Sequence, residues 1–162
     1  MDPHRLLLAP SHHYGNKLTK LNILCLSGED VEKSMYVSKF QKFLDQYEDK
    51  VGVLLIEPQW GLSQAAFQWP DNLPKTYVAM AKAGGIRIVC NEIMCRLGRH
   101  GKGTLFVCKA LDLDPDVITF EKAIGGGVFP FAGAILRNGC DALCSVRCTV
   151  MQSHSYAGAS IT

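Results

Sequence analysis

The sequence predicts an α/β fold, with three α/β/α layers around a mostly parallel sheet, and three observations support this. Apolar runs of strand length occupy residues 51–56, 86–90 and 117–120. They begin roughly thirty residues apart, and a helical pattern separates each pair. Such apolar runs are typical of central parallel strands covered on both faces, and strand–helix–strand alternation is typical of layered α/β proteins.

The predicted helices follow from apolar spacing and from residues at their ends. Ser27-Gly28-Glu29-Asp30 has the composition of a helix start. After it, one apolar stripe predicts a helix of about fifteen residues, formed by Tyr36, Phe40, Phe43, Leu44 and Tyr47. Residues 71–83 are predicted as a second helix, because Pro74 suits its first turn and Gly84-Gly85 suits its end. Residues 104–111 are predicted as a short helix.

The remaining segments are a long loop and the C-terminal part. Residues 58–70 are predicted to be irregular, and they carry Trp60 and Trp69. Loops of this length are often functional. Residues 128–136 are predicted to form one or two strands, interrupted at Pro130, and residues 141–147 a final helix. We expect residues 1–162 to form a single domain, since no internal repeat is visible.

Composition excludes several classes of protein. The chain is 48% apolar and 20% charged, and its net charge of +2 comes from scattered residues, which argues against nucleic-acid binding. No apolar run approaches the roughly 18 residues of a membrane helix, so no membrane association is expected. Seven cysteines without a framework spacing indicate a reducing compartment, cytoplasmic or mitochondrial.

Three of these cysteines recur every fourth residue, at Cys140, Cys144 and Cys148. This spacing places them on one helix face. A metal site would need a fourth ligand and closer pairing. We therefore favour small buried side chains over a metal site, and we expect no metal.

Each of the three predicted strands leads into a polar side chain: Glu57, Asn91-Glu92 and Lys122. In an open parallel sheet, ligands bind beyond the carboxyl ends of the strands. A lysine there can form an imine with a carbonyl compound, or it can simply be a solvated surface group. Glu57 and Asn91-Glu92 can equally be structural groups. The glycines at 125–127 let backbone approach a ligand closely, but they fit neither the dinucleotide fingerprint nor the P-loop.

Four segments at these positions resemble the class III pyridoxal-phosphate-dependent aminotransferases of fold type I. Ile-Glu-Pro-Gln-Trp-Gly at 56–61 is similar to I-E-P-x-Q-G, and residues 91–101 are similar to D-E-V-Q-T-G-F-G-R-T-G. Residues 115–127 resemble P-D-I-V-T-L-G-K-A-L-G-G-G, which is a highly specific motif. Residues 153–158 resemble H-x-x-T-Y-x-G-N. The resemblance runs from about Arg5 to Ile161 in the family's order.

The resemblance implies a role for each matching residue. Lys122 would bind pyridoxal 5'-phosphate as an imine and later move protons. Asn91 occupies the position of the aspartate that pairs with the pyridine nitrogen, and Met94 that of a glutamine near the ring oxygen. Ser155 matches a threonine that reaches the phosphate of the neighbouring subunit's cofactor. The remaining cofactor-binding candidates are Glu57, His13 and Tyr14. Either His13 or Tyr14 would stack on the cofactor ring.

Several residues depart from the family pattern. A carboxylate keeps the ring nitrogen protonated, typically by about one to three pKa units, whereas Asn91 carries no charge. The expected loss in carbanion stabilisation is on the order of ten- to thousand-fold. Met94 donates no hydrogen bond, Arg96 replaces a glycine, Leu62 replaces a glutamate, and Glu121 replaces a small residue.

We expect this chain to be the central part of a large domain, truncated at both ends. Alone, it would be incomplete and weakly active or inactive. The resemblance implies transfer of an amino group from an amine or amino acid to a 2-oxo acid. It also implies that the full-length protein is a homodimer. One alternative is an inactive relative that keeps only the fold and subunit packing. Another is an unrelated α/β nucleotide binder that uses the glycine run.

Overall fold

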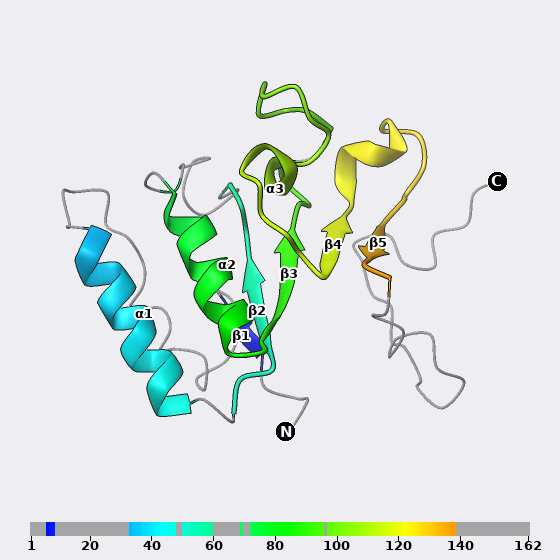
Figure 1. Cartoon of the computed structure of the whole chain (residues 1–162). Coiled ribbons are helices and arrows are strands. Elements are labelled where there is room, and N and C mark those ends of the chain that lie inside the picture. Colours follow the sequence, from blue (N-terminus) through cyan, green and yellow to red (C-terminus); the bar gives the residue numbers. More distant parts are fainter. Residues whose placement is uncertain are drawn as a thin grey trace, which may run out of the picture.

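The chain forms a five-stranded sheet in the order β1-β2-β3-β4-β5 (Figure 1). This computed structural model describes residues 6–8, 33–47, 50–59, 69, 72–95 and 97–138. The strands are β1 (Leu6–Leu8), β2 (Val53–Ile56), β3 (Arg87–Asn91), β4 (Val117–Phe120) and β5 (Gly133–Leu136). The helices are α1 (Lys33–Tyr47), α2 (Leu73–Ala83), α3 (Val107–Ala110) and the 3₁₀ turn η3 (Lys122–Gly125).

Strands β1 to β4 are parallel, and β5 pairs with β4 in the antiparallel direction. Ile56 of β2 lies opposite Cys90 of β3, and Asn91 lies opposite Thr119 of β4. The carboxyl ends of these three strands therefore lie along one edge of the sheet, as predicted. In Figure 1 this is the upper edge, where α3 and η3 also lie.

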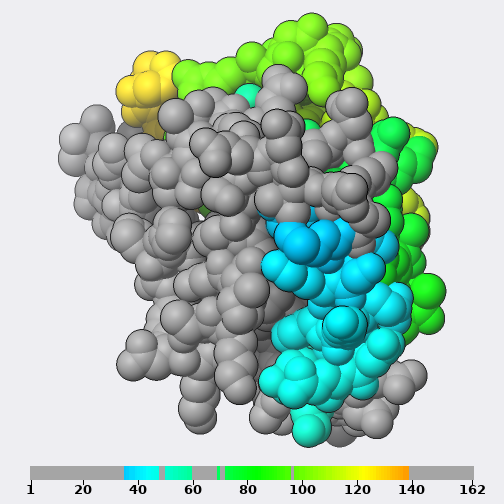
Figure 2. Space-filling model, turned by 90° about the vertical axis from the view of Figure 1, so that its left-hand side faces the viewer, coloured from blue at the N-terminus to red at the C-terminus, as the bar shows by residue number. Residues whose placement is uncertain are grey.

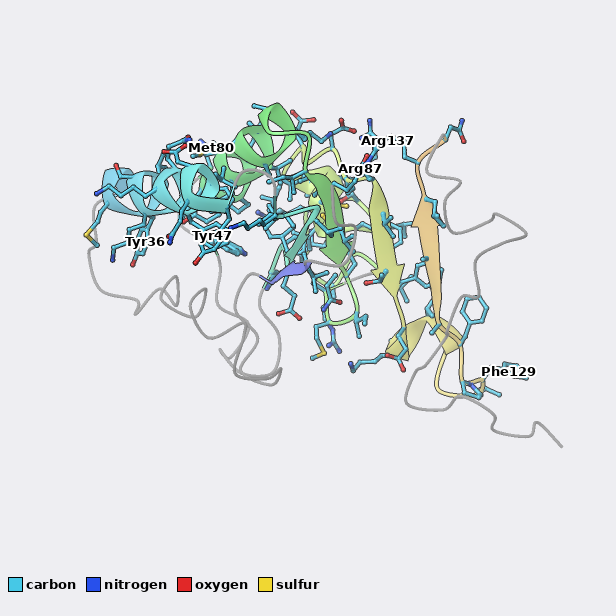
Figure 3. The ribbon with its side chains drawn as sticks, turned by 90° about the horizontal axis from the view of Figure 1, so that it is seen from below. Tyr36, Tyr47, Met80, Arg87, Phe129 and Arg137 are labelled. Carbon is cyan, nitrogen blue, oxygen red and sulfur yellow. The ribbon has the colours of Figure 1, made fainter. Side chains whose placement is uncertain are left out.

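The core forms where α1 and α2 pack on one face of the sheet (Figure 3). The ring centroids of Phe40 and Tyr77 lie 4.4 Å apart, and the Tyr77 hydroxyl donates to the Tyr36 carbonyl at 3.4 Å. Burial raises the pKa of Tyr77. From the sheet, Leu54 and Ile88 are also fully enclosed, so the apolar stripe of α1 and the apolar strands meet in one cluster. The outer side of α1 lies at the surface, in blue and cyan in Figure 2.

The predicted α/β fold and mostly parallel sheet are confirmed, and every predicted strand and helix within the described residues is present. The second helix starts two residues later than predicted, at Leu73, with Pro74 in its first turn and Gly84 at its end. The short helix is only four residues long, Val107–Ala110. Among the described helices, α1 and α2 cover the same face of the sheet. Of the predicted loop at 58–70, only Pro58, Gln59 and Trp69 are described, and the predicted helix at 141–147 lies outside the described residues.

Residues 128–136 differ from the prediction in a physical way. Only Gly133–Leu136 forms a strand, and it runs antiparallel to β4. Pro130 has no N–H to give to a ladder, so the chain before Gly133 stays irregular. No helix among the described residues is both long enough and apolar enough to cross a bilayer.

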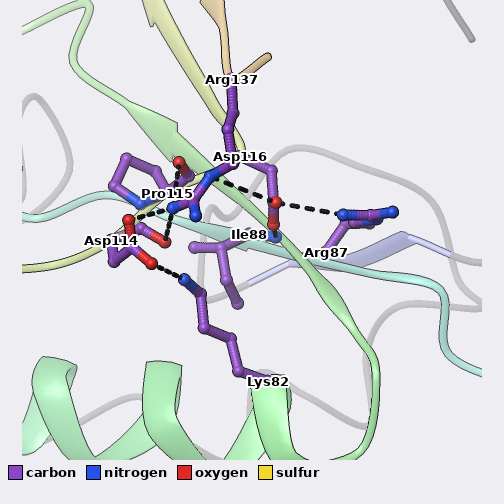
Figure 4. A network of polar contacts seen from close by, with 7 residues as sticks. All are labelled: Lys82, Arg87, Ile88, Asp114, Pro115, Asp116 and Arg137. Atoms are coloured by element: carbon purple, nitrogen blue, oxygen red, sulfur yellow. Dashed lines mark hydrogen bonds and ion pairs between the residues drawn. The ribbon is translucent and has the colours of Figure 1, made fainter. Parts of the chain in front are cut away.

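The opposite edge of the sheet is fastened by a polar network around Asp116 (Figure 4). The Asp116 carboxyl is buried, and its Oδ2 accepts the Ile88 backbone N–H at 2.8 Å. Its Oδ1 lies 3.3 Å from Arg87 Nη1 and 3.7 Å from Arg137 Nε. Asp114 joins the network by pairing with Lys82 and Arg137, whose contacts hold its pKa below the ordinary value. The network thus connects β3, β4, β5 and α2.

We predict that Asp116→Ala lowers the free energy of unfolding by about 1–3 kcal/mol, because the buried Ile88 N–H loses its acceptor. The matched control is Lys75→Ala, which removes an exposed pair with Asp112 at 2.6 Å and is expected to cost clearly less. Urea denaturation measures both values. Equal losses for the two variants would contradict the prediction.

Candidate functional site

The candidate site is the edge where β2, β3 and β4 end. Glu57 follows β2 directly, and Asn91 is the last residue of β3. Because Ile56 pairs with Cys90, Glu57 and Asn91 continue neighbouring strands whose backbones are roughly 5 Å apart. Glu57 is half-buried, and its carbonyl accepts the Trp69 indole N–H at 2.7 Å. The structure therefore brings two of the predicted site residues together.

Asn91 begins a tight turn that contains Met94. Its side-chain Oδ1 accepts the Ile93 backbone N–H at 3.1 Å, which is the hydrogen bond of an Asx turn. Since Oδ1 receives this bond, the side-chain orientation of Asn91 depends on the path of the turn. Both Asn91 and Met94 are half-buried, so their side chains are partly accessible at this edge.

Glu92 has a larger structural role than the sequence suggested. From the sequence, Asn91-Glu92 can be structural groups at the end of their strand. The structure shows that the Glu92 side chain reaches across to the start of α3 and accepts the backbone N–H groups of Val107 at 3.1 Å and Cys108 at 2.7 Å. It also accepts the Cys95 thiol at 3.1 Å, and it is 0% exposed. A partner fifteen residues away leaves no local pattern by which sequence reasoning could find it.

Lys122 lies at the same edge, two residues after the end of β4, and is the first residue of η3. Its backbone φ is 60°, in the left-handed region that non-glycine residues rarely adopt. The residue is exposed, whereas Glu121 before it is buried. The chain then turns through Gly126 (φ 65°) and Gly127 (φ 78°), where an added Cβ would meet no atom within 4 Å. Lys122 thus stands next to open backbone, on the segment drawn yellow at the upper left of Figure 2.

A row of aromatic rings supports the backbone that carries Lys122. The Phe120 centroid lies 6.4 Å from that of Phe106 and 6.0 Å from that of Phe131. The Phe120 ring also covers Gly133 in the neighbouring strand, where an added Cβ would stand 2.6 Å from the ring. Glycine at 133 is therefore required for the ring to lie across β5. Phe129, in the loop after η3, lies at the opposite end of the sheet from Arg87 and Arg137 (Figure 3).

The loop after the Asn91 turn, residues 97–106, closes on itself. The Gly98 N–H donates to the Leu105 carbonyl at 3.1 Å, and His100 Nε2 lies 3.0 Å from the Thr104 carbonyl oxygen. His100 Nδ1 accepts the Lys102 N–H at 3.2 Å, so Nε2 is the ring nitrogen that donates. Arg96, His13, Tyr14 and Ser155 lie outside the described residues, as do the three cysteines at 140, 144 and 148.

Comparison with models of protein families shows to which family this chain belongs. The family model for class III aminotransferases matches residues 6–158. The chain belongs to this family. Adenosylmethionine-8-amino-7-oxononanoate aminotransferase of Staphylococcus aureus is 27% identical over 112 residues, which are 67% of this chain but 24% of that protein. Ornithine aminotransferase of Halalkalibacterium halodurans is 37% identical over 79 residues, 48% of this chain and 19% of that one.

Solved transaminase structures share the fold. Taurine:2-oxoglutarate aminotransferase from Bifidobacterium kashiwanohense, solved with PLP and glutamate, aligns with a TM-score of 0.58 and 26% identity over 64% of this chain and 23% of that one. An omega-transaminase from Thermomicrobium roseum gives a TM-score of 0.65 at 23% identity, covering 80% of this chain and 30% of that one. This chain therefore spans about a quarter of such proteins.

The described residues fit pyridoxal phosphate, the cofactor that the family implies. A primary amine condenses with an aldehyde, and Lys122 offers its amine at an accessible sheet edge. The positive-φ glycines beside it leave room for a group that a side chain would otherwise fill. Asn91 and Glu57, from neighbouring strands, supply polar atoms along the same edge.

We predict that Gly133→Ala destabilises the protein by about 1–3 kcal/mol, because its methyl group would force the Phe120 ring out of position. Thermal or urea unfolding measures the loss. The control is Gly84→Ala, where the new Cβ meets its nearest neighbour at an ordinary 3.5 Å. If Gly133→Ala is as stable as that control, Phe120 does not depend on the glycine.

Proposed function

We propose that this chain carries the cofactor-binding edge of a transaminase, with pyridoxal 5'-phosphate held as an imine on Lys122. The full-length enzyme would transfer an amino group from an amine or amino acid to a 2-oxo acid, as a homodimer. The family membership and the position of Lys122 beside Gly126 and Gly127 support this proposal.

The observation that carries the proposal is the left-handed backbone of Lys122. Asn72, Leu97 and Asp112 also have a positive φ, but of these four described residues Lys122 is the one that carries an amine at the carboxyl end of a strand. A non-glycine residue in the left-handed region typically costs about 1–2 kcal/mol, which a glycine there would avoid. The cost is explained if the amine of Lys122 is needed at this position, since strained backbone often marks functional sites. The left-handed turn also takes Lys122 out of the pleat of β4, so its direction is not set by strand alternation.

The remaining residues define what the edge does to a bound cofactor. When bound, the cofactor supplies an electron sink for the substrate carbon. Asn91 would contact the ring nitrogen through its amide and give hydrogen bonding without charge. Met94 would offer an apolar contact, and Glu57 would bind at the neighbouring strand end. Lys122 would bind the cofactor and later carry the proton between substrate atoms.

We predict that incubation with pyridoxal phosphate and then borohydride labels Lys122, as mapped by peptide mass spectrometry. Lys122→Arg should abolish this label, because a guanidinium forms no stable imine. Lys102→Arg is the matched control, since Lys102 is an exposed lysine in the adjacent loop, and it should keep the label. Label that persists on other lysines in Lys122→Arg at the same yield would overturn the assignment.

Lys122→Gly tests the backbone argument separately. It should also lose the label, yet it should raise the free energy of unfolding by about 1 kcal/mol, because glycine accepts a positive φ without strain. Urea denaturation decides this. A less stable Lys122→Gly variant would show that the left-handed conformation is not strained in this context.

We predict that Asn91→Asp raises the transamination rate about ten- to thousand-fold in a full-length context. A carboxylate would hold the ring nitrogen protonated by charge, as the amide does not. The measurement is single-turnover rate with a saturating amine. An unchanged or lower rate would mean that Asn91 does not act on the ring nitrogen.

The second candidate is a relative that keeps the fold and subunit packing without chemistry. Asn91 and Met94 favour it, since Asn91 supplies no charge and Met94 donates no hydrogen bond. Absence of any label on Lys122 at saturating pyridoxal phosphate would support this candidate.

A further inference from the structure

Glu92 is a buried carboxyl that the proposed chemistry does not use. Its side chain accepts three hydrogen bonds, from the thiol of Cys95 and from the backbone N–H groups of Val107 and Cys108. A buried carboxyl without partners would be strongly destabilising, so these three donors are what make its position possible. Burial and the adjacent Glu92 carboxyl raise the pKa of Cys95, which keeps this thiol a donor.

We propose that Glu92 is a positioning residue that holds the turn at residues 91–95 in the shape that presents Asn91 and Met94 at the site edge. This inference rests on the proposed function, because the edge matters only if a ligand binds there. Glu92 touches no reacting group. It acts through the turn to which it belongs.

The geometry gives Glu92 control over three neighbouring segments. Its backbone N–H donates to the Thr119 carbonyl at 3.0 Å, which ties the end of β3 to β4 three residues before Lys122. Its side chain ties the same point to the start of α3. Through Cys95 it closes the turn on itself. Displacement of Glu92 would therefore move the turn relative to both β4 and α3.

Asn91 is the residue that this arrangement orients. Its Oδ1 accepts the Ile93 N–H, and Ile93 lies within the span that Glu92 and Cys95 close. If the span opens, the Ile93 N–H that donates to Asn91 loses its fixed place. Glu92 thus orients the Asn91 amide indirectly, through two hydrogen bonds of the turn: Cys95 to Glu92, and Ile93 to Asn91.

Glu92→Gln is the sharpest variant. Glutamine is nearly the same size, but it has one acceptor oxygen and an NH₂ group in place of the second. The two carboxyl oxygens of Glu92 receive different backbone donors, Oε2 from Val107 and Oε1 from Cys108. One of these donors would therefore face the NH₂ group, and the link to α3 would be broken at that point.

Asp116→Asn is the matched control. Asp116 is also a buried carboxyl that accepts a backbone N–H, from Ile88, but it lies at the opposite edge of the sheet. Both variants should lower the urea midpoint. Only Glu92→Gln should affect the site edge.

The experiment combines amide hydrogen exchange of the free chain with borohydride labelling over a pyridoxal phosphate titration. For Glu92→Gln, we expect exchange at Ile93 to accelerate, and the labelling midpoint of Lys122 to rise, each by about tenfold, the scale of one buried hydrogen bond. For Asp116→Asn, both readouts should stay within about twofold of the unmodified chain. Equal shifts in the two variants, or no change at Ile93, would overturn the proposal.

A second pair of variants keeps the test decisive if Glu92→Gln does not fold. Cys95→Ala removes only the thiol donor and should accelerate Ile93 exchange, whereas Cys95→Ser restores a donor and should return it toward normal. Identical exchange in both Cys95 variants would count against the positioning role. If the unmodified chain shows no label on Lys122, the proposed function fails, while the exchange measurements still decide the role of Glu92.

Discussion

The parallel register of β2, β3 and β4 is the constraint on which the rest of this structure depends. Three apolar strands side by side place their carboxyl ends at one edge, and with them Glu57, Asn91 and the chain that leads to Lys122. A shift of one residue in any strand would turn its side chains to the other face. The chemistry of the edge is therefore a result of how the core packs beneath it.

Two buried carboxyls secure this register at its two ends. Asp116 fastens the amino-terminal side of β4 to β3 and β5, and Glu92 fastens the carboxyl-terminal side of β3 to β4 and α3. Asp116 accepts a backbone N–H at the start of β3, and Glu92 accepts N–H groups at the start of α3, which have no acceptor within the helix. Each of these two carboxyls thus has specific hydrogen-bond donors within the chain itself.

Sequence reasoning located the α/β fold, the central strands and the edge because these depend on local apolar runs and on the general geometry of parallel sheets. It missed β1, whose three residues are too few to show a period, and the antiparallel direction of β5, which depends on pairing with β4. Sequence reasoning could not predict the left-handed backbone of Lys122 either, because a lysine in the sequence does not indicate a positive φ. Glu92 was visible as an acid, but its partners lie across a fold that only tertiary structure creates.

Glu92 also separates the loop at residues 97–106 from the edge. The chain leaves the turn near Cys95 and returns at Val107, and both points are bound to the same carboxyl. The loop between them therefore has both of its ends held by one side chain. The entropic cost of closing a loop between fixed ends rises by only about 0.6 kcal/mol per doubling of its length. A change in the length of this loop would therefore cost little and would leave the strand ends in place.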